Sequence, residues 1–162
     1  MNETYYEIMV TKKGSPIMKV AQIATAVLAG VSAVALIMGF FFGIVLAVVF
    51  GAACYLISLF SVVEYEYLYV DKELQIDRIL GKSRRKRMET LDLKQFEILA
   101  PMRSHELDKY RNKNYKVADY SSGAENAEKY MLIVGEKKIV FEPTAELVKT
   151  MRMFAPRNVF MY

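Results

Sequence analysis

The chain has 162 residues, and its 22 Lys and Arg residues against 18 Asp and Glu residues give a mild net charge of +4. A balance this even argues against a nucleic-acid-binding protein, which normally carries a strongly basic face. The single cysteine excludes a disulfide framework within the chain and a metal site built from cysteine ligands.

Residues 1–16 form a short segment ahead of the first long apolar stretch. Its Tyr5, Tyr6, Ile8 and Met9 side chains have two interpretations that the sequence leaves open. They anchor the chain at the cytoplasmic membrane interface, where tyrosine is favoured, or they form a strand or helix that packs on a soluble domain. The Gly and Pro residues that follow predict a break before a helix.

Residues 20–63 contain no Asp, Glu, Lys, Arg or His. A helix needs roughly 20 apolar residues to cross a bilayer core, so this stretch holds two spans. We predict transmembrane helices over residues 17–38 and 41–63, joined as an antiparallel hairpin with phenylalanines at the far interface. We expect both to be retained rather than cleaved as a signal peptide, because the second apolar span follows the first directly.

Positive charges flank this hairpin at one end. Lys12, Lys13 and Lys19 surround the start of the first span, and a basic run at residues 84–87 follows the second span after roughly 20 residues. The connection between the spans carries no charge. The positive-inside rule therefore predicts a multi-pass protein of the cell (inner) membrane with both termini in the cytoplasm.

Small residues recur at every fourth position in both spans, which places each set on one helix face. Such faces let membrane helices approach closely, so they predict the contact between the two spans or, alternatively, a homodimer face. The candidates are Ala21, Thr25, Ala29 and Ala33 in the first span and Gly43, Ala47 and Gly51 in the second. The lack of ionisable groups in the spans disfavours a channel or transporter.

Residues 64–157 change to the alternating pattern of β-strands, most clearly at Tyr65, Tyr67 and Tyr69. Strands are predicted at residues 64–70, 74–79, 84–91, 96–99, 115–120, 130–134 and 138–141. Residues 102–129 are otherwise expected to be loop, a helix capped by Thr144 covers residues 145–154, and residues 158–162 are a tail. The expected fold class is a membrane α-helical hairpin plus a mainly antiparallel β roll or barrel of six or seven strands with a C-terminal α-helix.

The basic run consists of Arg84, Arg85, Lys86 and Arg87. On a strand, alternate members point to opposite faces, so the run belongs at an edge or beyond the core. One interpretation is contact with anionic lipid headgroups, worth about 1 kcal/mol for each basic residue near the surface. The alternative is a solvated strand edge that resists aggregation and sets the membrane topology.

No residue pattern in the sequence strongly indicates a catalytic, metal-binding or phosphate-binding site. His105 has Asp108 nearby in sequence but no second ligand at metal spacing. Ser121 and Ser122 have no neighbouring base, and there is no glycine-rich loop for a phosphate. We therefore predict no catalytic residue, no metal site and no cofactor, and a protein that is not an enzyme.

The basic run belongs to a longer order of motifs. Two spans, a tyrosine-rich strand, a turn, a second strand and the run lead to Leu91-Asp92-Leu93 and Ile98-Leu99-Ala100-Pro101. Phe141-Glu142-Pro143 and Ala155-Pro156-Arg157 come later. This order resembles a family of short two-span bacterial membrane proteins with a bacterial pleckstrin-homology-like (PH-like) domain. The resemblance covers most of the chain, implies a PH-like fold for residues 64–157, and implies no established activity.

One departure from lipid-binding eukaryotic PH domains concerns the first hairpin loop. Those members hold phosphate with basic residues around that loop, whereas Asp71-Lys72-Glu73 is net acidic here. This difference argues against binding of inositol phosphates.

The sequence is thus interpreted as a non-catalytic, membrane-anchored interaction or scaffold protein that presents a PH-like domain at the cytoplasmic face. The alternatives are a sensor of anionic lipid headgroups that uses residues 84–87, and a small accessory subunit of a membrane transport or secretion complex. The expected partners are the lipid bilayer, anionic lipid, and a membrane-protein partner or a second copy of the chain, with no nucleic acid.

Overall fold

The computed structural model describes residues 5–161. They form two compact units. The helical unit contains Lys13–Val63 and Leu80–Arg84, and the strand unit contains the described residues before Lys13, Glu64–Ile79 and the residues from Arg85 onward. Residues 1–4 of the predicted N-terminal segment and residue 162 of the predicted tail lie outside the described residues.

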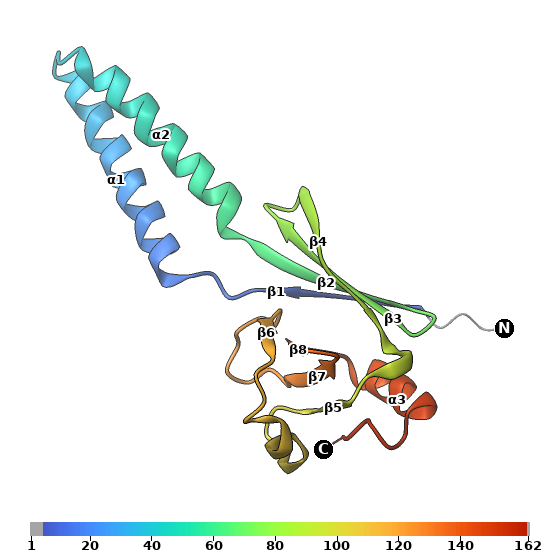
Figure 1. Cartoon of the computed structure of the whole chain (residues 1–162). Helices are drawn as coiled ribbons and strands as arrows, with labels where there is room; N and C mark the ends of the chain where they lie inside the picture. Colours follow the sequence, from blue (N-terminus) through green and yellow to red (C-terminus); the bar gives the residue numbers. More distant parts are fainter. Residues whose placement is uncertain (1–4, 162) are drawn as a thin grey trace. The chain divides into compact units, whose positions relative to one another are not determined.

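The helical unit is built on two long apolar helices, α1 at Pro16–Ile37 and α2 at Phe42–Ser61, which run side by side (Figure 1). α1 starts at a proline, whose fixed φ suits a first helical turn. Gly39, with φ of +93°, allows the tight connection between the helices. The most apolar part of each helix has a mean hydropathy of 2.2 in α1 and 2.4 in α2, and 6% of that part is buried in each helix. Both helices are therefore long and apolar enough to cross a membrane, close to the predicted ranges 17–38 and 41–63.

The contact between α1 and α2 follows spacings of three and four residues. Residues of low exposure along it are Gln22, Thr25, Ala29, Ser32 and Leu36 in α1 and Gly43, Ala47, Phe50, Cys54, Ile57 and Ser61 in α2. The Gln22 amide Nε2 donates to Ser58 Oγ at 2.9 Å across this contact. Alternating spacings of this kind are typical of long helices that pack nearly antiparallel.

The first sheet of the strand unit has the order β1-β2-β3-β4. Its strands are β1 at Tyr6–Thr11, β2 at Val63–Val70, β3 at Glu73–Leu80 and β4 at Arg84–Asp92. β1 pairs antiparallel with β2, from Tyr6 opposite Tyr69 to Thr11 opposite Glu64. The chain therefore leaves this sheet after β1, forms the helical pair, and returns as the strand beside the one it left.

The second sheet has the order β5-β7-β8-β6. Its strands are β5 at Ile98–Pro101, β6 at Lys116–Asp119, β7 at Tyr130–Val134 and β8 at Lys137–Phe141. All pairs are antiparallel except β6 with β8, which is parallel. Val159 forms a bridge with Leu99, so residues predicted as a tail pair with the edge of this sheet.

The two sheets are joined by a core rich in tyrosine. The Tyr67 ring meets Phe141 edge-on with centroids 5.5 Å apart, and the Tyr65 ring meets Tyr120 at 5.4 Å. Tyr67 is fully buried, and its hydroxyl donates to the Tyr120 carbonyl at 2.6 Å. Burial raises the pKa of Tyr67 above its ordinary value, which keeps the hydroxyl protonated as a donor.

The C-terminal helix α3 spans Ala145–Phe154 and begins at a Thr144 cap, whose Oγ1 accepts from the Leu147 N–H. Its apolar face buries Leu147, Val148 and Met151. Amphipathic spacing thus decides which face of the helix joins the core.

The predicted fold class is confirmed: apolar N-terminal helices are followed by antiparallel sheets of a PH-like domain and by a C-terminal helix. Within residues 5–161 the sheets do not close into a barrel, and they contain eight strands rather than six or seven. The additional strand is β1, so Tyr6–Thr11 of the N-terminal segment form a strand of the strand unit, which is one of the two alternatives left open. The predicted loop at residues 102–129 also contains a short 3-10 helix, His105–Tyr110, whereas β6 lies within the strand predicted at residues 115–120.

Candidate functional site

The turn between β3 and β4 lies against the last turn of α2 within the helical unit. The Gly81 N–H donates to the Val62 carbonyl at 3.0 Å. A Cβ on Gly81 would lie 2.3 Å from the Leu59 carbonyl oxygen, and its φ is +57°. Glycine is therefore required twice at this position, for the backbone conformation and for the close approach to α2.

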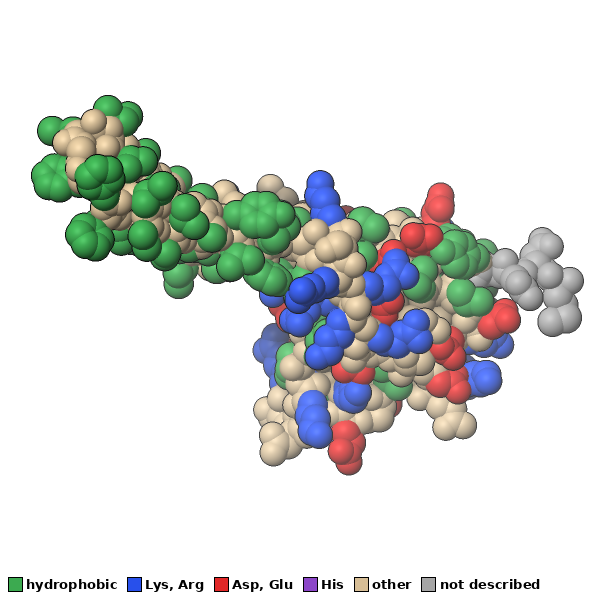
Figure 2. Space-filling model, turned by 90° about the horizontal axis from the view of Figure 1, so that it is seen from above, with side chains coloured by type: hydrophobic (Ala, Val, Ile, Leu, Met, Phe, Trp, Pro, Cys, Tyr) green, Lys and Arg blue, Asp and Glu red, His purple; other side chains and the backbone are tan. Residues whose placement is uncertain are grey.

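The same turn brings two cations to the end of α2. The Arg84 guanidinium lies over the Phe60 ring, 5.8 Å from its centroid, and Lys82 is exposed within the turn. Lys13 and Lys19 flank the start of α1, at the same end of the antiparallel pair. We call Lys13, Lys19, Lys82 and Arg84 the basic end of the helical unit. The opposite end carries exposed phenylalanines and no charge (Figure 2).

Arg85 and Arg87, the other half of the basic run, form ion pairs with acids of the strand unit. Arg85 contacts both Glu66 and Asp77, and Arg87 Nε lies 3.3 Å from Asp77 Oδ1. The two carboxylates are 1% and 2% exposed, whereas the arginines are 54% and 59% exposed. Two nearly buried acids are thus neutralised by cations that reach over them from β4, an edge strand of the sheet.

Glu66 has an unfavourable environment for its negative charge. Burial raises the pKa of Glu66 above its ordinary range, and the Arg85 guanidinium opposes this effect. Glu7 on β1 and Asp77 on β3 raise the pKa further because they carry like charges. Arg85 therefore compensates a crowded group of carboxylates on the face of the sheet that points away from the core.

Strand alternation divides the basic run into two pairs with different surroundings. Arg85 and Arg87 are paired with Glu66 and Asp77, while Arg84 belongs to the basic end. Lys86 is exposed and forms no ion pair with any described residue. Of the four candidates for lipid contact, Arg84 and Lys86 are therefore the ones whose charges are not compensated within the strand unit.

The predicted helix-packing residues divide in a similar way. Ala21, Thr25 and Ala29 are partly covered in α1, and a Cβ on Gly43 of α2 would lie 2.7 Å from the Ser32 carbonyl oxygen. Ala47 is also partly covered.

Ala33 and Gly51 lie outside this contact. Both are exposed, and a Cβ on Gly51 would meet nothing within 4 Å. A strict four-residue stripe drifts around the helix, whereas the real contact alternates spacings of three and four.

The other polar residues considered from the sequence make local contacts within the fold. His105 Nδ1 lies 3.5 Å from Asp108 with a fully exposed imidazole, and no group of three metal-binding side chains occurs among the described residues. The Ser122 N–H and hydroxyl both donate to Glu142 Oε1 at 2.7 Å, which ties down the loop. Lys72 of the first hairpin loop places its ammonium over the Phe154 ring, 5.5 Å from the centroid.

A lysine missed by the sequence analysis holds the 3-10 helix at His105–Tyr110. Lys138 is 8% exposed, and its ammonium donates to the Tyr110 carbonyl at 2.7 Å while lying over the Tyr115 ring. A cation is favoured at the C-terminal end of a helix. The only sequence signal was a lysine in a buried strand position.

Comparison with known proteins finds a matching family model. The family model described as a bacterial PH-like domain (DUF6106) matches residues 2–161, which is nearly the whole chain, helices included. No curated protein and no solved structure matches the chain. PH-like domains are typically non-catalytic. The chain is a member of this family of bacterial PH-like domain proteins.

Proposed function

We propose that the protein is a non-catalytic, membrane-anchored module whose helical pair crosses the cell membrane and presents the PH-like domain at the cytoplasmic face. In this proposal the basic end lies at the cytoplasmic leaflet and binds anionic headgroups. The supporting observation is the packing of the β3–β4 turn on the end of α2, which holds Lys82 and Arg84 beside the last turn of an apolar helix.

The electrostatics favour lipid as the partner of this end. A basic residue near an anionic membrane surface contributes about 1 kcal/mol, and the four cations of the basic end have no carboxylate partner among the described residues. Arg85 and Arg87 are compensated by Glu66 and Asp77, so they contribute less. These charges support a general electrostatic attraction to anionic lipid rather than recognition of one headgroup. The surface of the PH-like domain is then free to bind a protein partner.

The experiment uses an introduced indole as a reporter. The chain has no tryptophan, so Phe60→Trp creates a single indole beside Arg84, whose emission is separated from that of the tyrosines, and retains an aromatic face for the guanidinium. The full chain is reconstituted with brominated phosphatidylglycerol or brominated phosphatidylcholine at equal fractions. We expect the anionic lipid to quench several-fold more strongly, since two cations contribute about 2 kcal/mol.

The control separates this contact from net charge. Lys82→Gln with Arg84→Gln should sharply reduce this preference, and the part that remains is due to Lys13 and Lys19 at the same end. Lys94→Gln with Lys116→Gln removes the same charge from the strand unit and should leave the preference intact. Equal quenching by both lipids before any lysine or arginine is replaced would refute the lipid contact.

A further inference from the structure

A hollow of about 510 Å³ lies where the ladder between β5 and β7 ends. Its walls are Met102 and Arg103, which follow β5, and residues 125–129, which precede β7. The Met102 N–H donates to the Lys129 carbonyl at 2.9 Å, one step beyond the last pair of the ladder. The two walls are therefore held at a fixed separation, in the size range of small-ligand sites.

Both walls are also anchored away from the hollow. On one side, the Ser104 N–H donates to the Pro101 carbonyl at 2.9 Å, which closes a turn around Arg103. On the other side, Ser122 is tied to Glu142, and the Ser121 N–H donates to Asp119 at 2.8 Å. The hollow is thus a built feature of the strand unit and not a gap between loose loops.

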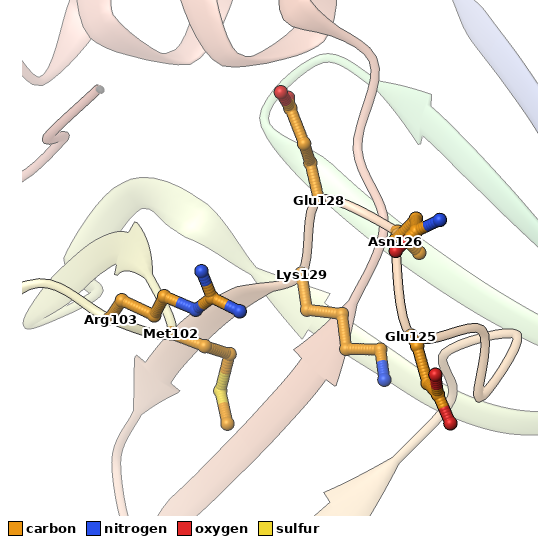
Figure 3. Close-up of a pocket in the computed structure, with 7 residues that line it drawn as sticks. Met102, Arg103, Glu125, Asn126, Glu128 and Lys129 are labelled. Carbon is orange, nitrogen blue, oxygen red and sulfur yellow. The ribbon is translucent and has the colours of Figure 1, made fainter.

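The charges around the hollow lack partners. Among the described residues, the side chains of Arg103, Lys129, Glu125 and Glu128 form no hydrogen bond or ion pair. Figure 3 shows the Arg103 guanidinium directed toward the segment that carries Lys129, the Lys129 ammonium pointing to the same side as Glu125, and Glu128 turned away from both. Two cations and one acid are therefore available to a ligand.

From this arrangement we infer that the hollow binds a small organic oxyanion. A carboxylate or phosphate group lies between Arg103 and Lys129, because a guanidinium fork and an ammonium suit such oxygens. Glu125 and the Asn126 amide receive a neighbouring ammonium or hydroxyl of the same molecule. The ligand class is a compact zwitterion that carries both a phosphate and an ammonium group, such as phosphoethanolamine. This site is independent of the basic end and of its lipid contact.

The hollow contains its own reporter, the methyl group of Met102. In the full chain in zwitterionic lipid nanodiscs, methionine-methyl NMR is recorded during titration with inorganic phosphate and with phosphoethanolamine, and Met102→Leu assigns the signal. We expect a saturable shift with both probes. Arg103→Gln or Lys129→Gln should weaken the affinity about tenfold or more, as expected for loss of a charge-assisted hydrogen bond. Lys116→Gln, a substitution of an exposed cation outside the hollow, should leave the affinity unchanged.

Comparing the two probes separates binding of the phosphate group from recognition of the ammonium group by Glu125. Tighter binding of phosphoethanolamine than of phosphate, lost in Glu125→Gln, supports the zwitterion, whereas equal affinities would overturn the role of Glu125. The site itself is refuted if neither probe gives a saturable shift. It is also refuted if sodium chloride at matched ionic strength reproduces the shift, or if the shift survives in Arg103→Gln with Lys129→Gln.

Discussion

Replacing Gly81 by alanine is expected to release the β3–β4 turn from the end of α2. The added Cβ would meet the Leu59 carbonyl oxygen at 2.3 Å, and the residue would have to keep a φ of +57°. The left-handed conformation costs about 1–2 kcal/mol for a residue with a side chain, and the overlap adds about 1–3 kcal/mol. The amides of residues 80–84 should lose protection from hydrogen exchange, because the Gly81 N–H is held by Val62.

Gly135 provides a matched control for this substitution. It lies in the turn between β7 and β8 with a φ of +56°, and a Cβ there would meet nothing within 4 Å. Gly135→Ala therefore carries the conformational cost without the overlap. If the two variants lose equal protection at residues 80–84, or if Gly81→Ala loses none, the turn does not depend on contact with α2.

The second large effect is an asymmetry between the arginines and the acids of the charged group. Arg85→Gln should lower the free energy of unfolding by about 1–2 kcal/mol, because it leaves the nearly buried Glu66 carboxylate without its cation, while Asp77 keeps Arg87. Glu66→Gln should be close to neutral, because the arginine left behind is 54% exposed and stays hydrated. Chemical unfolding of the full chain in detergent, followed by tyrosine fluorescence, measures both.

The pH dependence tests the cause of this asymmetry. The pKa of Glu66 is already raised by burial, and loss of Arg85 raises it further. A raised pKa contributes stability below the unfolded value of about 4.3 and loses it as the pH rises through the folded value. The defect of Arg85→Gln should thus be largest near neutral pH and shrink as the pH falls toward 4. Lys86→Gln, which removes an unpaired cation from the same strand, should show no such trend; a defect independent of pH would contradict the explanation.

Much of the fold is local in origin, and such parts can be predicted from the sequence. The absence of charge over residues 20–63 specifies two helices, and alternation at Tyr65, Tyr67 and Tyr69 specifies a strand with one buried face. The Thr144 cap and the apolar spacing after it specify α3. Each of these signals depends on neighbours within a few turns of chain.

The position of β1 could not be derived in this way. Its partner β2 follows the whole helical pair, so the pairing of Tyr6 with Tyr69 is a long-range contact. Interfacial tyrosines and strand tyrosines have the same local pattern. Tertiary pairing decided between the two alternatives.

The contact of Gly81 with the end of α2 can be predicted from the lengths of β2 and β3. β2 and β3 are eight residues each around a two-residue turn, so the chain returns to the end of α2 when it reaches Leu80. Counted along the sequence, the basic run lay far beyond the second span, whereas in space its first member lies over Phe60. Strand alternation predicts that Arg85 and Arg87 point to the opposite face from Arg84 and Lys86. Their acidic partners could not be predicted from sequence spacing, because Glu66 and Asp77 lie on two other strands.

The central claim is that the helical pair crosses the membrane with the basic end on the cytoplasmic side. Labelling with a membrane-impermeant maleimide tests it most directly, in a Cys54→Ala background that removes the single native cysteine. Phe41→Cys in the connection between α1 and α2 should be labelled in intact cells, and Ser83→Cys in the β3–β4 turn should be labelled after lysis alone. Labelling of Ser83→Cys in intact cells, or protection of Phe41→Cys there, would contradict the proposed anchoring.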